Sequence, residues 1–167
     1  MKLFKVLFIL LVVFISCGGG GGSDGGGNGG GGGGGGDGSN HFMATFMQGN
    51  NSVDYSPISV TTQIGFDKVS IFTFNVKGST FDMFFERPEE VPIEIDLIQD
   101  PFAPKGGASI TFGGNFYVYS SGTVFVTQMT NERVTGDFDF LATSQLDGSV
   151  IEVTGSFNLP DGILAFQ

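Results

Sequence analysis

The chain has 167 residues, with 17 Asp and Glu against 7 Lys and Arg, and its formal net charge is −10 at pH 7. This acidic balance excludes nucleic acid as an expected partner and argues against flat adsorption on anionic lipid, because both surfaces are polyanionic. The single cysteine rules out an internal disulfide, and one histidine leaves too few ligands for a usual zinc site. We therefore expect neither a metal nor a cofactor.

The first 16 residues predict a signal peptide. Lys2 and Lys5 form a basic start, and the following apolar stretch ends at Ile15. A membrane-spanning helix needs about 20 apolar residues, so this stretch is too short to span and has the length of a secretory signal.

The tetrapeptide Phe14-Ile15-Ser16-Cys17 resembles the lipobox that the lipoprotein signal peptidase recognises, with Phe14 where the motif usually has leucine. The resemblance implies cleavage after residue 16 and acylation of Cys17. Two or more acyl chains would hold the protein stably at a membrane. The alternative is that Cys17 is an ordinary small apolar residue of a signal or anchor segment.

Residues 18–38 contain 17 glycines, and this composition predicts a flexible coil with an r.m.s. span of roughly 25 Å. A phosphate-binding glycine loop would need a preceding strand, a following helix and usually a lysine. The run instead follows the signal, so we expect 17–38 to be the acylated cysteine and its tether.

The residue after the cysteine is Gly18 and not the aspartate that retains many lipoproteins at the inner membrane. The resemblance thus implies a lipid anchor in the bacterial cell envelope, at the outer membrane. The domain would face the periplasm or the cell surface.

Residues 39–167 have the length of one domain. Loss of Lys2 and Lys5 with the signal leaves 5 basic and 17 acidic residues, a formal charge of −12. Period-two alternation dominates this part and predicts half-buried strands, the first over 41–47. The residues that share a strand face are Ile58, Val60, Thr62 and Ile64; Phe72, Phe74 and Val76; Phe81, Met83 and Phe85; and Val91, Ile93, Ile95 and Leu97.

Turn residues separate these strands at regular intervals, for example Gly113-Gly114-Asn115, Ser120-Ser121-Gly122 and 145–148. We therefore predict an all-β fold, a single antiparallel β-sandwich or flattened barrel with mostly meander connectivity. The near-repeats 134–140 and 153–159 both read V-T-G, polar, Phe, and their glycines are expected where a Cβ would crowd a neighbour or where a bulge bends the strand.

Several features together resemble a group of small uncharacterised bacterial lipoproteins of Bacteroidota-like envelopes. These are the lipobox, the low-complexity tether, the start at 42–44, the segment 119–124 and the paired V-T-G-x-F strands. The resemblance covers most of residues 41–159. It implies an all-β lipoprotein domain and brings no activity or catalytic residue.

Candidate chemistry is sparse. His41 is the only histidine, stands where the tether meets the domain and is expected to be an ordinary strand residue. Glu94 with Asp96, and Asp137 with Asp139, are two apart and should each share a strand face. Paired carboxylates can hydrolyse glycosides or bind calcium, but a solvated strand face explains them equally.

Tyr117 and Tyr119 share the strand face opposite to Phe116 and Val118. An exposed aromatic platform could bind a sugar or a peptide, so the two tyrosines are a candidate ligand face. The alternative is that both faces of this strand are buried between layers.

Because no catalytic set is present, the protein is not expected to be an enzyme. The favoured hypothesis is a membrane-anchored envelope lipoprotein whose β domain binds a protein or glycan or acts as a coat. The alternatives are a carrier of an apolar small ligand or lipid in a β cavity, and a carboxylate-based hydrolase.

Overall fold

The computed structural model describes residues 39–97 and 105–166, which form one antiparallel sheet of 11 strands. The strands are β1 (His41–Gln48), β2 (Asn51–Tyr55), β3 (Ser59–Ile64), β4 (Lys68–Phe74), β5 (Thr80–Glu86), β6 (Ile93–Asp96), β7 (Gly106–Phe112), β8 (Asn115–Met129), β9 (Arg133–Ser144), β10 (Val150–Pro160) and β11 (Gly162–Ala165). The predicted all-β, mostly meander fold is confirmed. The predicted signal peptide, Cys17 and the whole predicted tether lie outside the described residues.

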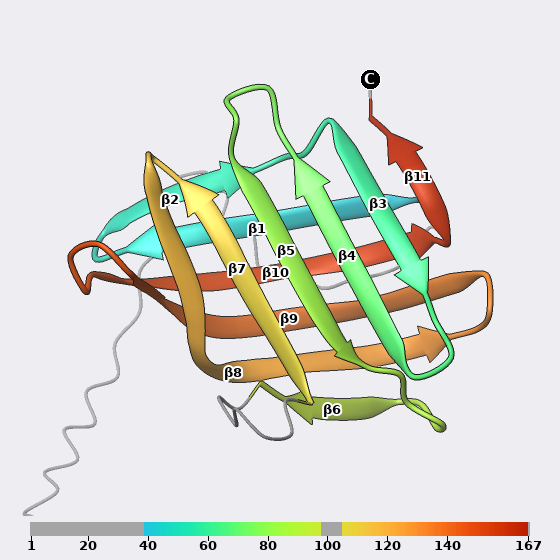
Figure 1. Cartoon of the computed structure of the whole chain (residues 1–167). Helices are drawn as coiled ribbons and strands as arrows, with labels where there is room; N and C mark the ends of the chain where they lie inside the picture. Colours follow the sequence, from blue (N-terminus) through green and yellow to red (C-terminus); the bar gives the residue numbers. More distant parts are fainter. Residues whose placement is uncertain (1–38, 98–104, 167) are drawn as a thin grey trace, which may run out of the picture. The chain divides into compact units, whose positions relative to one another are not determined.

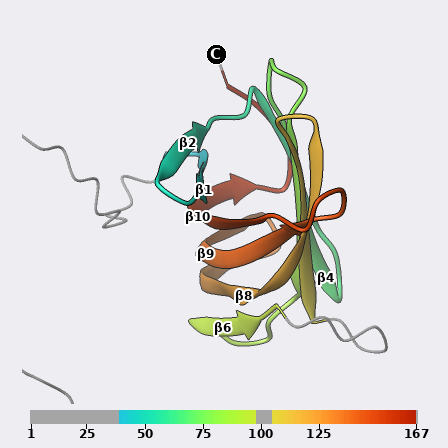
Figure 2. The same ribbon diagram turned by 90° about the vertical axis from the view of Figure 1, so that its left-hand side faces the viewer.

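Neighbouring strands follow the order β11-β3-β4-β5-β7-β8-β9-β10-β1-β2, and β6 pairs with β8. The sheet is strongly curled into a half-barrel, so one part of it covers the other. In Figure 1, β3, β4, β5 and β7 lie side by side and cross β1, β10 and β9 behind them. Figure 2 shows the curl from the side. We call β11, β3, β4, β5, β7 and the start of β8 the front layer, and the remaining strands the back layer.

The turn predicted at Ser120-Ser121-Gly122 is wrong, because β8 continues through it from Asn115 to Met129. A register shift between Tyr119 and Ser121 leaves Ser120 as an extra residue opposite β9. Gly122 has φ +145°, and a Cβ there would collide with the Phe140 backbone. Such bulges bend a strand, and this one lets β8 pass from β7 in the front layer to β6 in the back layer.

The V-T-G near-repeats form the centres of β9 and β10, which pair with each other. The register sets Gly136 opposite Phe157 and Gly155 opposite Phe138, so each glycine faces the phenylalanine of the other repeat. A Cβ on Gly136 would lie 2.9 Å from Cζ of Phe157. The prediction that these glycines stand where a Cβ would crowd a neighbour is confirmed.

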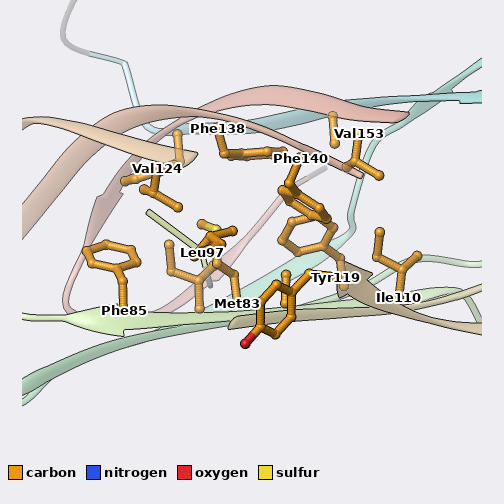
Figure 3. Close-up of a cluster of buried hydrophobic side chains, with 14 of the residues drawn as sticks. Met83, Phe85, Leu97, Ile110, Tyr119, Val124, Phe138, Phe140 and Val153 are labelled. Carbon is orange, nitrogen blue, oxygen red and sulfur yellow. The ribbon is translucent and has the colours of Figure 1, made fainter. Parts of the chain in front are cut away.

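The core lies between the layers. Figure 3 shows Met83, Phe85 and Ile110 of the front layer facing Phe138 and Phe140 of the back layer. The shared face predicted for Phe81, Met83 and Phe85 is the buried side of β5. Of the set predicted over 58–64, Val60 and Thr62 are buried and Ile64 is half-buried, whereas Ile58, which precedes β3, is 38% exposed.

The phenylalanines of strand β4 lie on its exposed side and not on its buried side. Val69 and Ile71 are buried, whereas Phe72 and Phe74 are 46% and 41% exposed. Both faces of this strand are apolar, so alternation alone does not select the inner one. The register decides it, because Val69 and Ile71 pair with the inward-facing Phe85 and Met83 of β5.

Candidate binding face

The outer side of the front layer carries four phenylalanines. They are Phe72 and Phe74 of β4, Phe84 of β5 and Phe116 of β8; Phe84 is half-buried and Phe116 is 49% exposed. We call this surface, including the polar residues between the rings, the phenylalanine face. Contiguous exposed apolar surface on a folded domain marks an interaction site more often than scattered apolar residues do.

Hydroxyl-bearing side chains separate the rings. Phe74 pairs with Ser59 on one side and Thr80 on the other, and Phe72 pairs with Thr61 on β3. The same two rows reach Ser109 and Thr111 on β7, and then Val118 and Phe116 on β8. Neighbouring strands are about 4.8 Å apart, so each ring has a polar side chain beside it at about that distance, and two threonines separate Phe74 from Phe116.

Asp82 lies at the centre of the face, opposite Phe72 on β4 and Ser109 on β7. Burial raises the pKa of its carboxyl above the usual value. Within the described ranges, its carboxylate makes no hydrogen bond or ion pair. Its oxygens are accessible to water, because no described side-chain oxygen is both buried and without a hydrogen-bond partner. A ligand hydroxyl could replace this water as the donor.

One end of the face is closed by Lys68 and Glu86, which are opposite each other in the β4–β5 register. The Lys68 Nζ lies 5.5 Å from the centroid of the Phe84 ring. Gly107 pairs with Phe84, and a Cβ at Gly107 would lie 2.8 Å from Cε1 of Phe84 and 2.9 Å from Cε1 of Tyr119. The glycine therefore makes room for two rings at this end.

Tyr117 and Tyr119, the ligand face predicted from the sequence, are only 3% and 9% exposed. Tyr117 pairs with the inward-facing Ile110, and burial raises the pKa of Tyr119. They form no exposed platform, so the predicted ligand face is wrong; the alternative that both faces of the strand are buried is also wrong, because Phe116 is exposed. The exposed aromatic residue of this strand segment is Phe116, on the opposite face.

The outer side of the back layer is acidic. Glu94 and Asp137 pair with Phe125 from opposite sides, and Asp96 and Asp139 flank Thr123 in the same way. The prediction that each acidic pair shares a strand face is confirmed. The two pairs lie on β6 and β9, on either side of β8. We call this surface, with Asp54 and Glu152, the acidic face. In the described part of the chain, no three acidic, His or Cys side chains gather closely enough to hold a metal ion.

His41 begins β1, where its Nε2 lies 3.3 Å from Oγ of Ser156 and its Nδ1 lies 3.2 Å from the Ser39 carbonyl oxygen. A serine beside a histidine is the start of a nucleophilic site. Ser156, however, pairs with Met43 on one side and Asp137 on the other. The neighbouring backbone N–H groups are therefore used by the sheet and are not available for an oxyanion.

Two hollows lie on the described domain, and neither is lined by a phenylalanine of the phenylalanine face; the smaller one meets the end of that face at Glu86. One of about 550 Å³ is lined by Thr130, Asn131, Glu132, Arg133, Pro160 and Asp161. The other, of about 200 Å³, lies among Glu86, Arg87, Pro88, 93–96 and Lys105. Both are lined mainly by polar and charged residues, and the smaller is below the usual volume of a ligand pocket.

No protein family, curated protein or solved structure matches this chain. Across residues 39–97 and 105–166, no helix has the length and apolar character needed to cross a membrane.

Proposed function

We propose that this protein is a lipid-anchored protein of the bacterial cell envelope whose β domain binds a partner without catalysis. The phenylalanine face is the binding surface. The observation that carries this proposal is the joint exposure of Phe72, Phe74 and Phe116 on one side of one sheet layer. Covering half of a phenylalanine side chain contributes roughly 1 kcal/mol, so three such rings support a specific contact.

The anchor half of the proposal rests on Cys17 and its resemblance to a lipobox. Acylation there would place the domain at the outer membrane, behind the glycine-rich segment 18–38. A flexible spacer of this composition lets the domain turn its phenylalanine face toward a partner.

A binding face receives more support than carriage of a ligand inside the domain. The ring centroids of Phe42 and Phe81 are 5.1 Å apart, and those of Phe46 and Phe112 are also 5.1 Å apart. The interior rings therefore contact each other and fill the space that a carried ligand would need.

The binding half is tested with two matched triple variants of the full chain and solubilised envelope extract. The first changes Phe72, Phe74 and Phe116 to Thr, and the second changes the exposed residues Met43, Phe125 and Leu141 of the acidic face to Thr. We expect the first variant to lose capture of envelope material and the second to keep it. Equal capture by both variants would contradict the proposal.

The anchor half is tested by Cys17→Ser in the producing bacterium. We expect the wild-type chain to fractionate with the outer membrane and to carry acyl chains by mass spectrometry. The variant should lack the acyl mass. An unmodified wild-type Cys17 would contradict the anchor.

A further inference from the structure

We propose that the phenylalanine face binds an uncharged polysaccharide, with Asp82 accepting hydrogen bonds from the sugar hydroxyls. This inference rests on the proposed function, because it names the partner class of the same surface.

The pattern of the face matches the chemistry of a sugar chain. A sugar ring has an apolar C–H face and a rim of hydroxyl groups. The C–H face can lie on Phe72, Phe74 or Phe116, whose ring faces carry partial negative charge. The hydroxyls between these rings, such as those of Thr80 and Thr111, which lie next to each other between Phe74 and Phe116, can both donate and accept hydrogen bonds.

Asp82 supplies the strongest acceptor. An ionised carboxylate accepts only, and its hydrogen bonds are stronger than those between neutral groups. Its position between Phe72 and Ser109 places the acceptor among the rings. The absence of a partner in the described domain leaves both of its oxygens for a ligand's O–H donors.

Charge argues for an uncharged partner. The face holds three charged side chains, Asp82 at its centre and Lys68 and Glu86 at its end, so its net charge is only −1. The mature chain has 17 acidic and 5 basic residues once Lys2 and Lys5 are removed. An anionic polymer would be repelled, and a second copy would bring two Asp82 carboxylates together under the same repulsion.

Shape argues for an extended polymer. Small molecules bind in concave sites, whereas the exposed phenylalanines lie on the outer side of a sheet and line neither hollow. An extended peptide commonly binds by adding a strand to a sheet edge. Strands β4 and β5, which carry Phe72, Phe74 and Asp82, have a paired neighbour on each side, so strand addition would not cover these residues. A polysaccharide needs no strand pairing.

The probe is a panel of insoluble neutral polysaccharides, namely cellulose, mannan and starch, with cross-linked polygalacturonate as the anionic counterpart. The purified full chain, in detergent, should be retained by at least one neutral polymer and not by polygalacturonate. Retention should be unchanged between about 50 mM and about 500 mM NaCl, because no ion pair is formed. Phe72→Thr with Phe74→Thr should weaken binding about tenfold or more, and Asp82→Asn about fivefold. The matched control, Phe125→Thr with Leu141→Thr, should bind as the wild type does.

Failure to bind any neutral polymer, or binding that the Phe72, Phe74 and Asp82 variants do not change, would overturn the inference. Far-UV circular dichroism and thermal unfolding establish that each variant is folded. Envelope extract treated with proteinase K or with periodate separates this failure from that of the proposed function. If proteinase K destroys capture through the phenylalanine face and periodate does not, the partner is a protein. The proposed binding function is then supported and the polysaccharide inference is contradicted. If untreated extract gives no capture that depends on this face, both proposals are contradicted.

Discussion

The phenylalanine face and the acidic face are two outer sides of the same curled sheet, and they have different chemistry. The first presents Phe72, Phe74 and Phe116 with one central carboxylate, whereas the second presents the carboxylates of Glu94, Asp96, Asp137, Asp139, Asp54 and Glu152. The inner sides are alike, since both are packed with buried apolar residues. Folding requires the apolar inner sides but leaves the outer sides free, so the difference between the outer sides points to function.

The acidic face also explains how the domain can carry exposed rings. Like charge keeps copies of a protein apart and soluble. Concentrating carboxylates on the back layer leaves the front layer free to be nearly uncharged. On our proposal, the acidic face keeps the domain soluble and the phenylalanine face binds the partner.

The largest expected loss of stability comes from disturbing the core, which supports both faces. Gly155→Val places a side chain against the Met43 carbonyl oxygen and the Phe138 ring. We expect the free energy of unfolding to fall by about 3 kcal/mol or more, measured by urea denaturation. Thr154→Val, on the outer side of the same strand, is the control and should change it little. A loss below about 1 kcal/mol for Gly155→Val would show that the back layer adjusts more easily than its packing indicates.

A second test concerns a buried hydrogen bond on the inner side of β4. The Tyr55 hydroxyl lies 2.6 Å from Oγ1 of Thr73, which is 0% exposed. Tyr55→Phe leaves this buried hydroxyl without its partner and should cost about 1–3 kcal/mol in thermal or urea unfolding. Adding Thr73→Val should recover part of the loss. No recovery in the double variant would contradict the assigned role of the hydrogen bond.

A third test uses the two sides of β4 directly. Ile71→Ala should destabilise the domain by about 2–5 kcal/mol, because Ile71 is 1% exposed in the core. Phe72→Thr with Phe74→Thr should cost about 2 kcal/mol at most for the two changes together, because only about half of each side chain is covered. Urea denaturation of the two variants decides the point. A larger loss from the phenylalanine pair would mean that the rings serve folding more than recognition.

The smallest expected effect concerns Asp82. Because burial raises the pKa of this carboxyl, the folded domain holds its proton more tightly than the unfolded chain. Its ionisation therefore lowers stability as pH rises from about 3.9, the unfolded value, through the folded pKa. Asp82→Asn should raise the Tm at neutral pH, and the gain should vanish below about pH 3.

Asp147 is the matched contrast to Asp82. Hydrogen bonds with Ser144 and then Ser149 lower the pKa of the Asp147 carboxyl. Its contribution to stability is present above the unfolded pKa and is lost as pH falls through the lowered one. Asp147→Asn should therefore lower the Tm at neutral pH, with no effect at low pH. The same sign of change for both variants would contradict this assignment.

Much of the sheet could be predicted from the sequence, because alternation and turn residues act locally. The V-T-G repeats, the inward sets of β3 and β5 and the shared faces of the acidic pairs all follow from period two. Ser120-Ser121-Gly122 has the composition of a turn, but the long-range contact of Gly122 with Phe140 makes it a bulge. No local pattern distinguishes these two outcomes.

The candidate site was harder to predict than the sheet. Both sides of β4 are apolar, so the outward turn of Phe72 and Phe74 depends on register with β5, which single-strand alternation does not contain. The available signal was that Val69 and Ile71 supply a second, β-branched apolar face on the same strand. The prediction that the tyrosines of β8, and not Phe116, form the ligand face was wrong for the same reason, because alternation does not say which face of a strand is buried.

The most direct test of the phenylalanine face as a binding surface is photo-crosslinking in the cells that produce the protein. A photoreactive phenylalanine analogue is placed at Phe74 on this face and, separately, at Leu141 on the acidic face, which are similarly exposed at 41% and 42%. Our account predicts a discrete adduct after illumination from position 74 and none from position 141. Adducts from position 141 alone, or from neither position, would contradict it.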